Sequence, residues 1–326
     1  MNKTMAVGVA ASVCSVLLVS SACADEPLSK AESESASEGL VQQMHEVFSA
    51  GFDLDFFSSY VWRNSVFTDE PVLQPCVWAD LTYFEPFWLG FYVWQNYDLT
   101  SRRHEVLKGG LTETDYDIHL GATAWTSDDE AMSLEFLLGY TWYVNQQVLS
   151  DAREAYKNTS ELYLRADFKN EILNVYGQVS WMPDDYGAFK QGMYYEVGVN
   201  KEIDLASVID IPEETLSLGA DWNVGFGDSR YLYYLYGGVD GGVDYREGED
   251  GEETWSNPDA GIGGTTVKAY LTWNITEWMS LVGTIAYTGV LNGSARQALN
   301  DAGTGWQGNC YRRDLLWGGC SLKFSF

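Results

Sequence analysis

The chain has 326 residues and a formal net charge of −28, from 47 acidic and 19 basic side chains. So large an excess of acid repels phosphates, which excludes nucleic acid as a partner. Aromatic residues make up 15% of the chain, which excludes a disordered protein, and with only 3 His and 5 Cys we expect no metal site and no cofactor.

Residues 1–24 have the pattern of a secretory signal peptide. Lys3 supplies a positive start, residues 5–19 are apolar and uncharged, and Ala-Cys-Ala at residues 22–24 is a small-x-small cleavage site. The apolar run is too short for a membrane-spanning helix. A lipidated Cys23 would lack the large aliphatic residue that usually lies three positions earlier. We therefore expect an exported chain.

Residues 25–50 are small, polar and acidic, and we expect a flexible periplasmic N-terminus there. From Gly51 to Phe326 the apolar residues recur at every second position, which is typical of strands with one apolar and one polar face. The pattern predicts twelve strands, at residues 52–63, 77–83, 87–96, 115–124, 134–143, 161–169, 175–181, 194–200, 216–226, 267–275, 280–287 and 316–326.

Most of these segments approach the nine to eleven residues that a membrane-crossing strand needs, which exceeds the usual length of soluble strands. Short and long connections alternate along the chain, as in outer-membrane barrels. The sequence therefore predicts an all-β, antiparallel, up-and-down transmembrane barrel over residues 51–326. We expect it in the outer membrane of a Gram-negative bacterium, surrounded by lipid, with both termini in the periplasm. A terminal aromatic on an alternating strand, here Phe326, is what barrel-insertion machinery commonly reads.

Aromatic residues near the ends of the apolar faces predict interface girdles at Tyr60, Trp62, Tyr83, Trp142, Trp181 and Tyr287. The opposite faces predict a polar lumen. We expect it to be lined by Asp53, Asp55, Arg63, Asp80, Trp94, Asp115, Asp117, His119, Glu135, Arg165, Asp167, Glu196, Asp221, Lys268 and Lys323. Acids outnumber bases on these faces, so a water-filled path would favour neutral or cationic solutes.

Other inward aromatics, such as Trp78, Trp88, Tyr163 and Tyr270, either stack against sugar rings or fill a narrow interior, and we expect filling. Cys76 and Cys310 both fall near the outer rim, and the exported compartment permits a disulfide between them. The long acidic connection at residues 228–264 has the oxygen ligands that Ca²⁺ prefers, but a solvated loop explains it as well.

One stretch has a family resemblance. Residues 59–63 read Ser-Tyr-Val-Trp-Arg and are followed by Thr-Asp at 68–69, by Leu-Gln-Pro at 73–75 and by Gly-Phe-Tyr-Val-Trp at 90–94. This resembles a family of bacterial outer-membrane barrels catalogued as conserved hypothetical proteins. Asn64 stands where that family has Gly, and Asn tolerates the left-handed conformation that a turn needs. The resemblance implies an outer-membrane location and no particular activity.

Three functions compete for such a barrel. The first is a passive, porin-like channel for small solutes, and the second is a non-conducting structural or surface-binding barrel. The third is a membrane-embedded hydrolase, which needs a Ser–His pair with a supporting group. His119 lies in a strand beside Asp117, where a structural histidine is the better interpretation, so we expect no catalytic residue and no enzyme.

Overall fold

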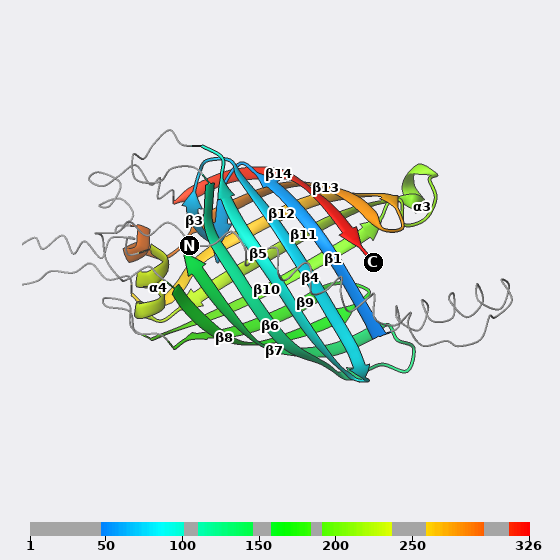
Figure 1. Ribbon diagram of the computed structural model, residues 1–326, viewed down its shortest axis with the longest axis horizontal. Coiled ribbons are helices and arrows are strands. Elements are labelled where there is room, and N and C mark those ends of the chain that lie inside the picture. Colours follow the sequence, from blue (N-terminus) through cyan, green and yellow to red (C-terminus); the bar gives the residue numbers. More distant parts are fainter. Residues whose placement is uncertain (1–46, 101–109, 146–157, 184–190, 237–258, 297–312) are drawn as a thin grey trace, which may run out of the picture. The chain divides into compact units, whose positions relative to one another are not determined.

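The computed structural model describes residues 47–100, 110–145, 158–183, 191–236, 259–296 and 313–326 (Figure 1). Residues 1–46, which include the expected signal peptide and most of the expected N-terminal segment, lie outside the described residues. Most of the acidic connection at 228–264 also lies outside them.

Twelve of the described strands close into one antiparallel barrel, as the sequence predicts. Each strand pairs with its neighbour in the chain, and β1 closes the ring by pairing with β14 on one side and β4 on the other. The strands are β1 (Phe48–Phe57), β4 (Val72–Phe84), β5 (Phe87–Asp98), β6 (Gly110–Thr126), β7 (Met132–Asn145), β8 (Asn158–Asn170), β9 (Asn174–Met182), β10 (Gly192–Asp204), β11 (Leu216–Gly227), β12 (Gly261–Thr276), β13 (Met279–Val290) and β14 (Asp314–Ser325).

The two ends of the barrel differ. At one end, the turn end, short links join β4 to β5, β6 to β7, β8 to β9 and β12 to β13, and the start of β1 and the end of β14 lie at the same end (Figure 1). The link from β10 to β11 is longer there and holds the short helix α3 (Ala206–Ile209). At the other end, the loop end, the long connections join the strands. None of the helices in the described residues is long and apolar enough to cross a membrane.

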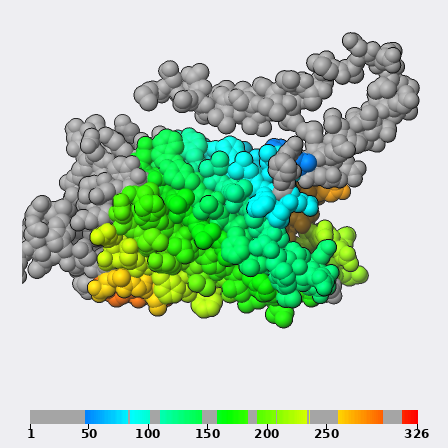
Figure 2. All heavy atoms as spheres, turned by 90° about the horizontal axis from the view of Figure 1, so that it is seen from below, coloured from blue at the N-terminus to red at the C-terminus, as the bar shows by residue number. Residues whose placement is uncertain are grey.

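The outer face of the wall is apolar although it is exposed. Leu138, Leu164 and Ile118 project from the middle of their strands with about half of their surface uncovered (50%, 50% and 51%). Figure 2 shows one side of this wall, where side chains of neighbouring strands abut one another. A soluble protein buries such residues, so this continuous apolar surface fits a lipid environment.

The predicted girdle is partly correct. Trp142, Trp181 and Tyr287 lie exposed on the outer face. Tyr60 and Trp62 do not, because β1 ends at Phe57 and the chain then turns into the barrel. There it forms a separate two-stranded sheet of β2 (Tyr60–Trp62) and β3 (Ser65–Thr68), which we call the inner hairpin. The prediction of one strand through residue 63 was therefore wrong: the alternation runs on through Ser58 and Ser59, but the strand does not.

Candidate functional site

The inner hairpin has a two-residue turn at Arg63 and Asn64, both with positive φ (49° and 64°). Such conformations are those of the tight turns that match the twist of paired strands, and Asn adopts them more easily than most residues. The expected tolerance of Asn64 for a left-handed turn is therefore confirmed. This turn places the Arg63 side chain at the tip of the hairpin, inside the barrel.

Arg63 is the main anchor of the inner hairpin. Its guanidinium forms a close ion pair with Glu161 of β8 and donates to Ser180 Oγ of β9 at 3.1 Å. It also donates to the Tyr231 hydroxyl at 2.6 Å and lies over the ring of Tyr194, 4.5 Å from its centroid. Glu161 is fully buried, so the pair is shielded from solvent. Arg63 was expected on the wall; it instead reaches the wall from the hairpin tip.

The neighbours of Arg63 contact other sectors of the wall. Asn64 accepts a hydrogen bond from Thr266 of β12 at 2.5 Å. Tyr60 donates to Glu113 of β6 at 2.9 Å and packs against the ring of Trp94. On the opposite side, Val66 packs in a buried apolar cluster with Ala286, Leu315 and Trp317 of β13 and β14. The hairpin therefore spans the lumen from wall to wall.

A short helix covers the hairpin. Helix α4 (Ser229–Tyr236) follows β11, and Tyr231 stacks on Tyr194 with ring centroids 5.1 Å apart. Ser65 donates to the Leu235 carbonyl at 3.0 Å, which connects hairpin and helix directly. Leu232 and Leu235 are buried with Val290 and Ala295 in a second apolar cluster. The sequence interpretation counted residues 229–236 with the acidic connection and missed this helix, although their four Tyr and two Leu differ from the Gly- and acid-rich stretch that follows.

The remaining predicted lumen residues lie on the inner wall and are largely paired. Lys169 donates to Glu135 at 2.8 Å, and Arg165 makes two hydrogen bonds to Asp167 at 2.7 and 2.8 Å. Glu196 accepts from the hydroxyls of Tyr176 and Tyr194. Lys323 lies 4.0 Å from Asp53, and Lys268 lies opposite Asp221 in the strand register. These contacts form a structural network, yet solvent reaches it: 53% of the Lys169 side chain and 44% of the Lys323 side chain are exposed.

Three inward carboxylates have an oxygen with no partner. Asp55, Asp115 and Asp221 each have a buried Oδ1 that receives no hydrogen bond from the described residues. A buried acceptor without a donor costs free energy. The inner wall therefore has more negative charge than its own bases and donors satisfy.

Asp117 and His119 of β6 form a tight pair on the same wall, at 2.8 Å from Nδ1 to Oδ1. Asp117 also accepts from Thr141 at 2.6 Å and from the Tyr163 hydroxyl at 3.3 Å. The other ring nitrogen of His119 faces Asp80 of β4 at 3.9 Å. The sequence predicted the proximity of Asp117 to His119 but did not identify Asp80 as the residue opposite.

Several inward aromatic rings lie across glycines instead of projecting into the lumen. A Cβ on Gly51 would overlap the ring of Trp78, and one on Gly121 would overlap that of Trp88. Gly139 and Tyr163, and Gly219 and Tyr270, form similar pairs, so the arrangement recurs around the barrel. Filling of the lumen was expected; in these pairs the ring is accommodated against the wall.

The cysteine predictions have different outcomes. Cys76 lies on the inner wall, opposite Asp53 in the register, and forms no disulfide with any described residue, whereas Cys310 lies outside the described residues. The proposed disulfide between them therefore stays a prediction. Cys320 lies exposed on the outer face and forms no disulfide with any described residue.

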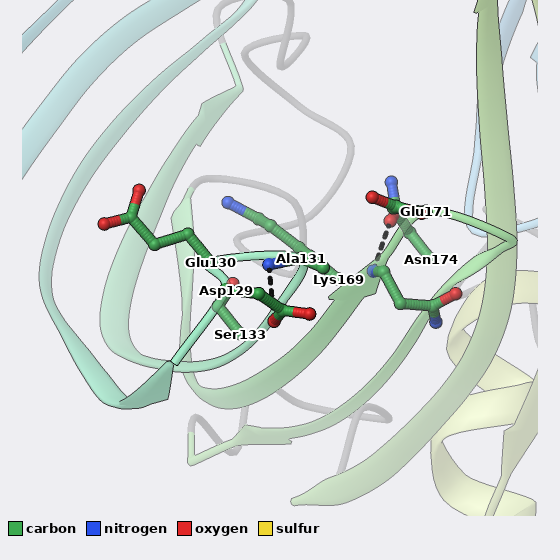
Figure 3. Close-up of a pocket in the computed structure, with 8 residues that line it drawn as sticks. Asp129, Glu130, Ala131, Ser133, Lys169, Glu171 and Asn174 are labelled. Atoms are coloured by element: carbon green, nitrogen blue, oxygen red, sulfur yellow. Dashed lines mark hydrogen bonds between the residues drawn. The ribbon is translucent and has the colours of Figure 1, made fainter. Parts of the chain in front are cut away.

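A shallow pocket of about 460 Å³ lies at the turn end, between the β6–β7 and β8–β9 links (Figure 3). Asp129 points to the backbone of its own turn, and hydrogen bonds from Ser127 and from the Ala131 amide lower the pKa of its carboxyl group. Lys169 at its edge is already paired with Glu135. Because Asp129 and Lys169 already have partners, neither is available to a ligand in this pocket.

No protein-family model and no curated protein matches the chain. Among solved structures, an outer membrane channel from Pseudomonas putida F1 is 12% identical with a TM-score of 0.44, over 86% of this chain and 94% of that one. Outer membrane phospholipase A from Escherichia coli is 12% identical with a TM-score of 0.43, over 85% and 89%. Pseudomonas putida OprB is 10% identical with a TM-score of 0.35, and the chain spans 59% of its length. At this level of similarity the likeness concerns the fold alone.

The fold and the site together define a class of protein. The chain is a closed twelve-stranded β-barrel with the apolar exterior of membrane barrels, and an inward-folded hairpin occupies the loop half of its lumen.

Proposed function

We propose that the protein is an outer-membrane channel for small neutral or cationic solutes, which the inner hairpin holds closed. The observation that carries the proposal is the uneven filling of the lumen. The hairpin contacts Glu113, Glu161 and Tyr194, each within the first four residues of its strand at the loop end. Nearer the turn end the wall is open to solvent, as the exposed Lys169 and Lys323 show.

The charge of the open part supports the preference for cations. Its bases are engaged by neighbouring acids, while 38% of the Asp80 side chain is exposed and faces a single histidine. A narrow path with unbalanced carboxylates attracts cations and repels anions. Neutral solutes are not subject to this selection.

The second candidate is a non-conducting barrel with a structural or surface-binding role. The burial of the Arg63–Glu161 pair favours it, because a buried ion pair with several hydrogen bonds is costly to separate. The two candidates therefore differ in one property, which is whether the hairpin ever leaves the lumen.

We do not propose an enzymatic role. A hydrolytic dyad needs a nucleophile within hydrogen-bond reach of the histidine. In the described part of the chain the group facing His119 Nε2 is the Asp80 carboxylate and not a hydroxyl.

The location and the partners complete the proposal. The start of β1 and the end of β14 both lie at the turn end. Short turns face the periplasm in outer-membrane barrels, so we place both termini in the periplasm. Lipid covers the apolar wall. Phe326 is 62% exposed at the end of β14, where it is available to barrel-insertion machinery during assembly.

Planar-bilayer conductance of the refolded protein tests the proposal. The informative variant replaces residues 59–67 with a short Gly-Ser linker, which the geometry permits because Phe57 and Val72 are already paired neighbours. Shortening the α3 link, at the opposite end, is the matched control. We expect the hairpin-free barrel to give discrete, cation-preferring steps and the control to behave as the parent. A hairpin-free barrel that folds, by heat-modifiable migration, and stays silent would establish the non-conducting alternative.

A further inference from the structure

The imidazole of His119 lies between two carboxylates, with Nδ1 toward Asp117 and Nε2 toward Asp80. Asp117 receives three contacts, from Thr141, Tyr163 and His119, and its side chain is fully buried. The short contact to Nδ1 assigns that nitrogen as the proton donor, because a carboxylate only accepts. In the neutral imidazole, Nε2 then has a free lone pair.

That lone pair faces a second carboxylate across a small gap. Nε2 lies 3.9 Å from Asp80 Oδ1, which is too long for a direct hydrogen bond. Gly90 lies beneath both groups, and a Cβ there would overlap His119 Nε2 and Asp80 Oδ1 alike. The missing side chain therefore lets the two groups converge, and solvent in the lumen reaches them through the partly exposed Asp80.

We propose that His119 Nε2 and Asp80 bind a divalent transition-metal ion, of which zinc is the best match, with Asp117 as the positioning residue. Imidazole nitrogen and carboxylate oxygen are ordinary zinc ligands, and two such atoms around a tetrahedral ion with bonds of about 2.1 Å lie about 3.4 Å apart. The observed 3.9 Å needs only a small side-chain rotation. A carboxylate that holds the far nitrogen of a metal-binding histidine is the usual supporting arrangement.

The proposed site has two protein ligands, and this small number bears on how tightly it holds an ion. The described residues contain no group of three or more His, Cys, Asp and Glu side chains able to hold an ion, so an ion bound by His119 and Asp80 would take its other ligands from water. A site of this kind binds weakly and releases readily, which suits an ion that passes through a lumen. This role in passage rests on the proposed channel function, whereas the binding itself does not. The scarcity of His and Cys argued against a site built only from those residues; this one needs a single histidine.

The structural alternative is that His119 lies between the two carboxylates only as part of the wall and binds no metal. Zinc chloride titrated into the full-length refolded protein, followed by calorimetry, separates the two. We expect the parent to bind one more zinc ion than His119→Gln, which keeps the other histidines and the thiols as background. Asp80→Asn should lose the same ion, and Asp117→Asn should bind it about 10- to 100-fold more weakly.

Two controls make the result specific. Asp53→Asn removes an inward acid elsewhere on the wall and should leave zinc binding unchanged, and calcium chloride should not distinguish the parent from His119→Gln. Heat-modifiable migration confirms that each variant is folded, with His119→Asn as a second substitution. Equal zinc binding by the parent and the folded His119 variants would overturn the proposal. Zinc binding in a barrel that never conducts would leave the site intact and refute the channel alone.

Discussion

Replacing Arg63 by alanine should open the lumen. The change leaves Glu161 buried without its cationic partner, with the Tyr231 hydroxyl still donating to it at 3.2 Å, and it removes the charge that lies over the Tyr194 ring. Removing one partner of a buried ion pair costs about 3–5 kcal/mol. Because about 1.4 kcal/mol corresponds to a factor of ten, the ratio of closed to open barrels should fall by about two to four powers of ten.

Single-channel recording in planar bilayers measures this ratio as open probability. Arg165→Ala is the matched control, since Arg165 is also an inward arginine paired with an acid, Asp167, but it is partly exposed. We expect many more openings for Arg63→Ala than for Arg165→Ala. Adding Glu161→Gln to Arg63→Ala removes the stranded charge and should restore part of the closed population. If Arg63→Ala is folded and opens no more often than Arg165→Ala, the inner hairpin is not held by this ion pair.

Three further predictions concern stability, measured as the temperature at which the folded, fast-migrating form is lost. Asp115→Asn should raise that temperature, because Asp115 has a buried oxygen without a donor, and the expected gain in the free energy of unfolding is about 1–3 kcal/mol. A decrease would show that the carboxylate is satisfied. Gly121→Ala should lower the free energy of unfolding by about 1–3 kcal/mol, and the transition temperature with it, since the new Cβ meets the Trp88 ring. Gly283→Ala, where nothing lies within 4 Å of the new Cβ, should be nearly neutral, and equal effects of the two changes would refute the steric argument. Leu138→Arg on the outer face should cost about 2–4 kcal/mol in a bilayer, and a neutral outcome would argue that lipid does not contact this part of the wall.

The twelve strands were predictable because each has one face toward lipid and one toward the lumen. Apolar and polar residues therefore alternate along every strand. The inner hairpin was not predictable in the same way. Tyr60 and Trp62 continue the alternation of β1, so periodicity alone assigns them to the lipid face. The signal available in the sequence was local, since Arg63 and Asn64 separate two short alternating runs. In the structure both residues adopt the positive φ of a tight turn.

The candidate site was predictable by face but not by partner. Alternation predicts that Asp80, Asp117 and His119 face the lumen, and in the structure His119 lies 2.8 Å from Asp117 and 3.9 Å from Asp80. Which side chains meet across the strands depends on register, and register depends on bulges such as the shift between Leu81 and Phe84 that no pattern in the sequence marks. The role of Gly90 was unpredictable for the same reason, since it depends on His119 and Asp80, whose atoms occupy the space that a Cβ on Gly90 would need.

The attachment of the inner hairpin bears on how the lumen of the proposed channel would open. The hairpin belongs to residues 58–71, and the residues that flank this segment, Phe57 and Val72, are paired in adjacent strands. A segment of this length with its ends in contact behaves as one compact loop. At its base Ser58 bonds to Gly318 of β14, and the Pro71 carbonyl accepts from Leu99 just after β5. Neither bond belongs to the pairing of two barrel strands, so the segment can leave the lumen without unpairing the barrel. The free energy that keeps the lumen closed therefore resides in the contacts of the hairpin itself, among which the Arg63–Glu161 pair is the most deeply buried charged one, and not in the sheet that spans the membrane.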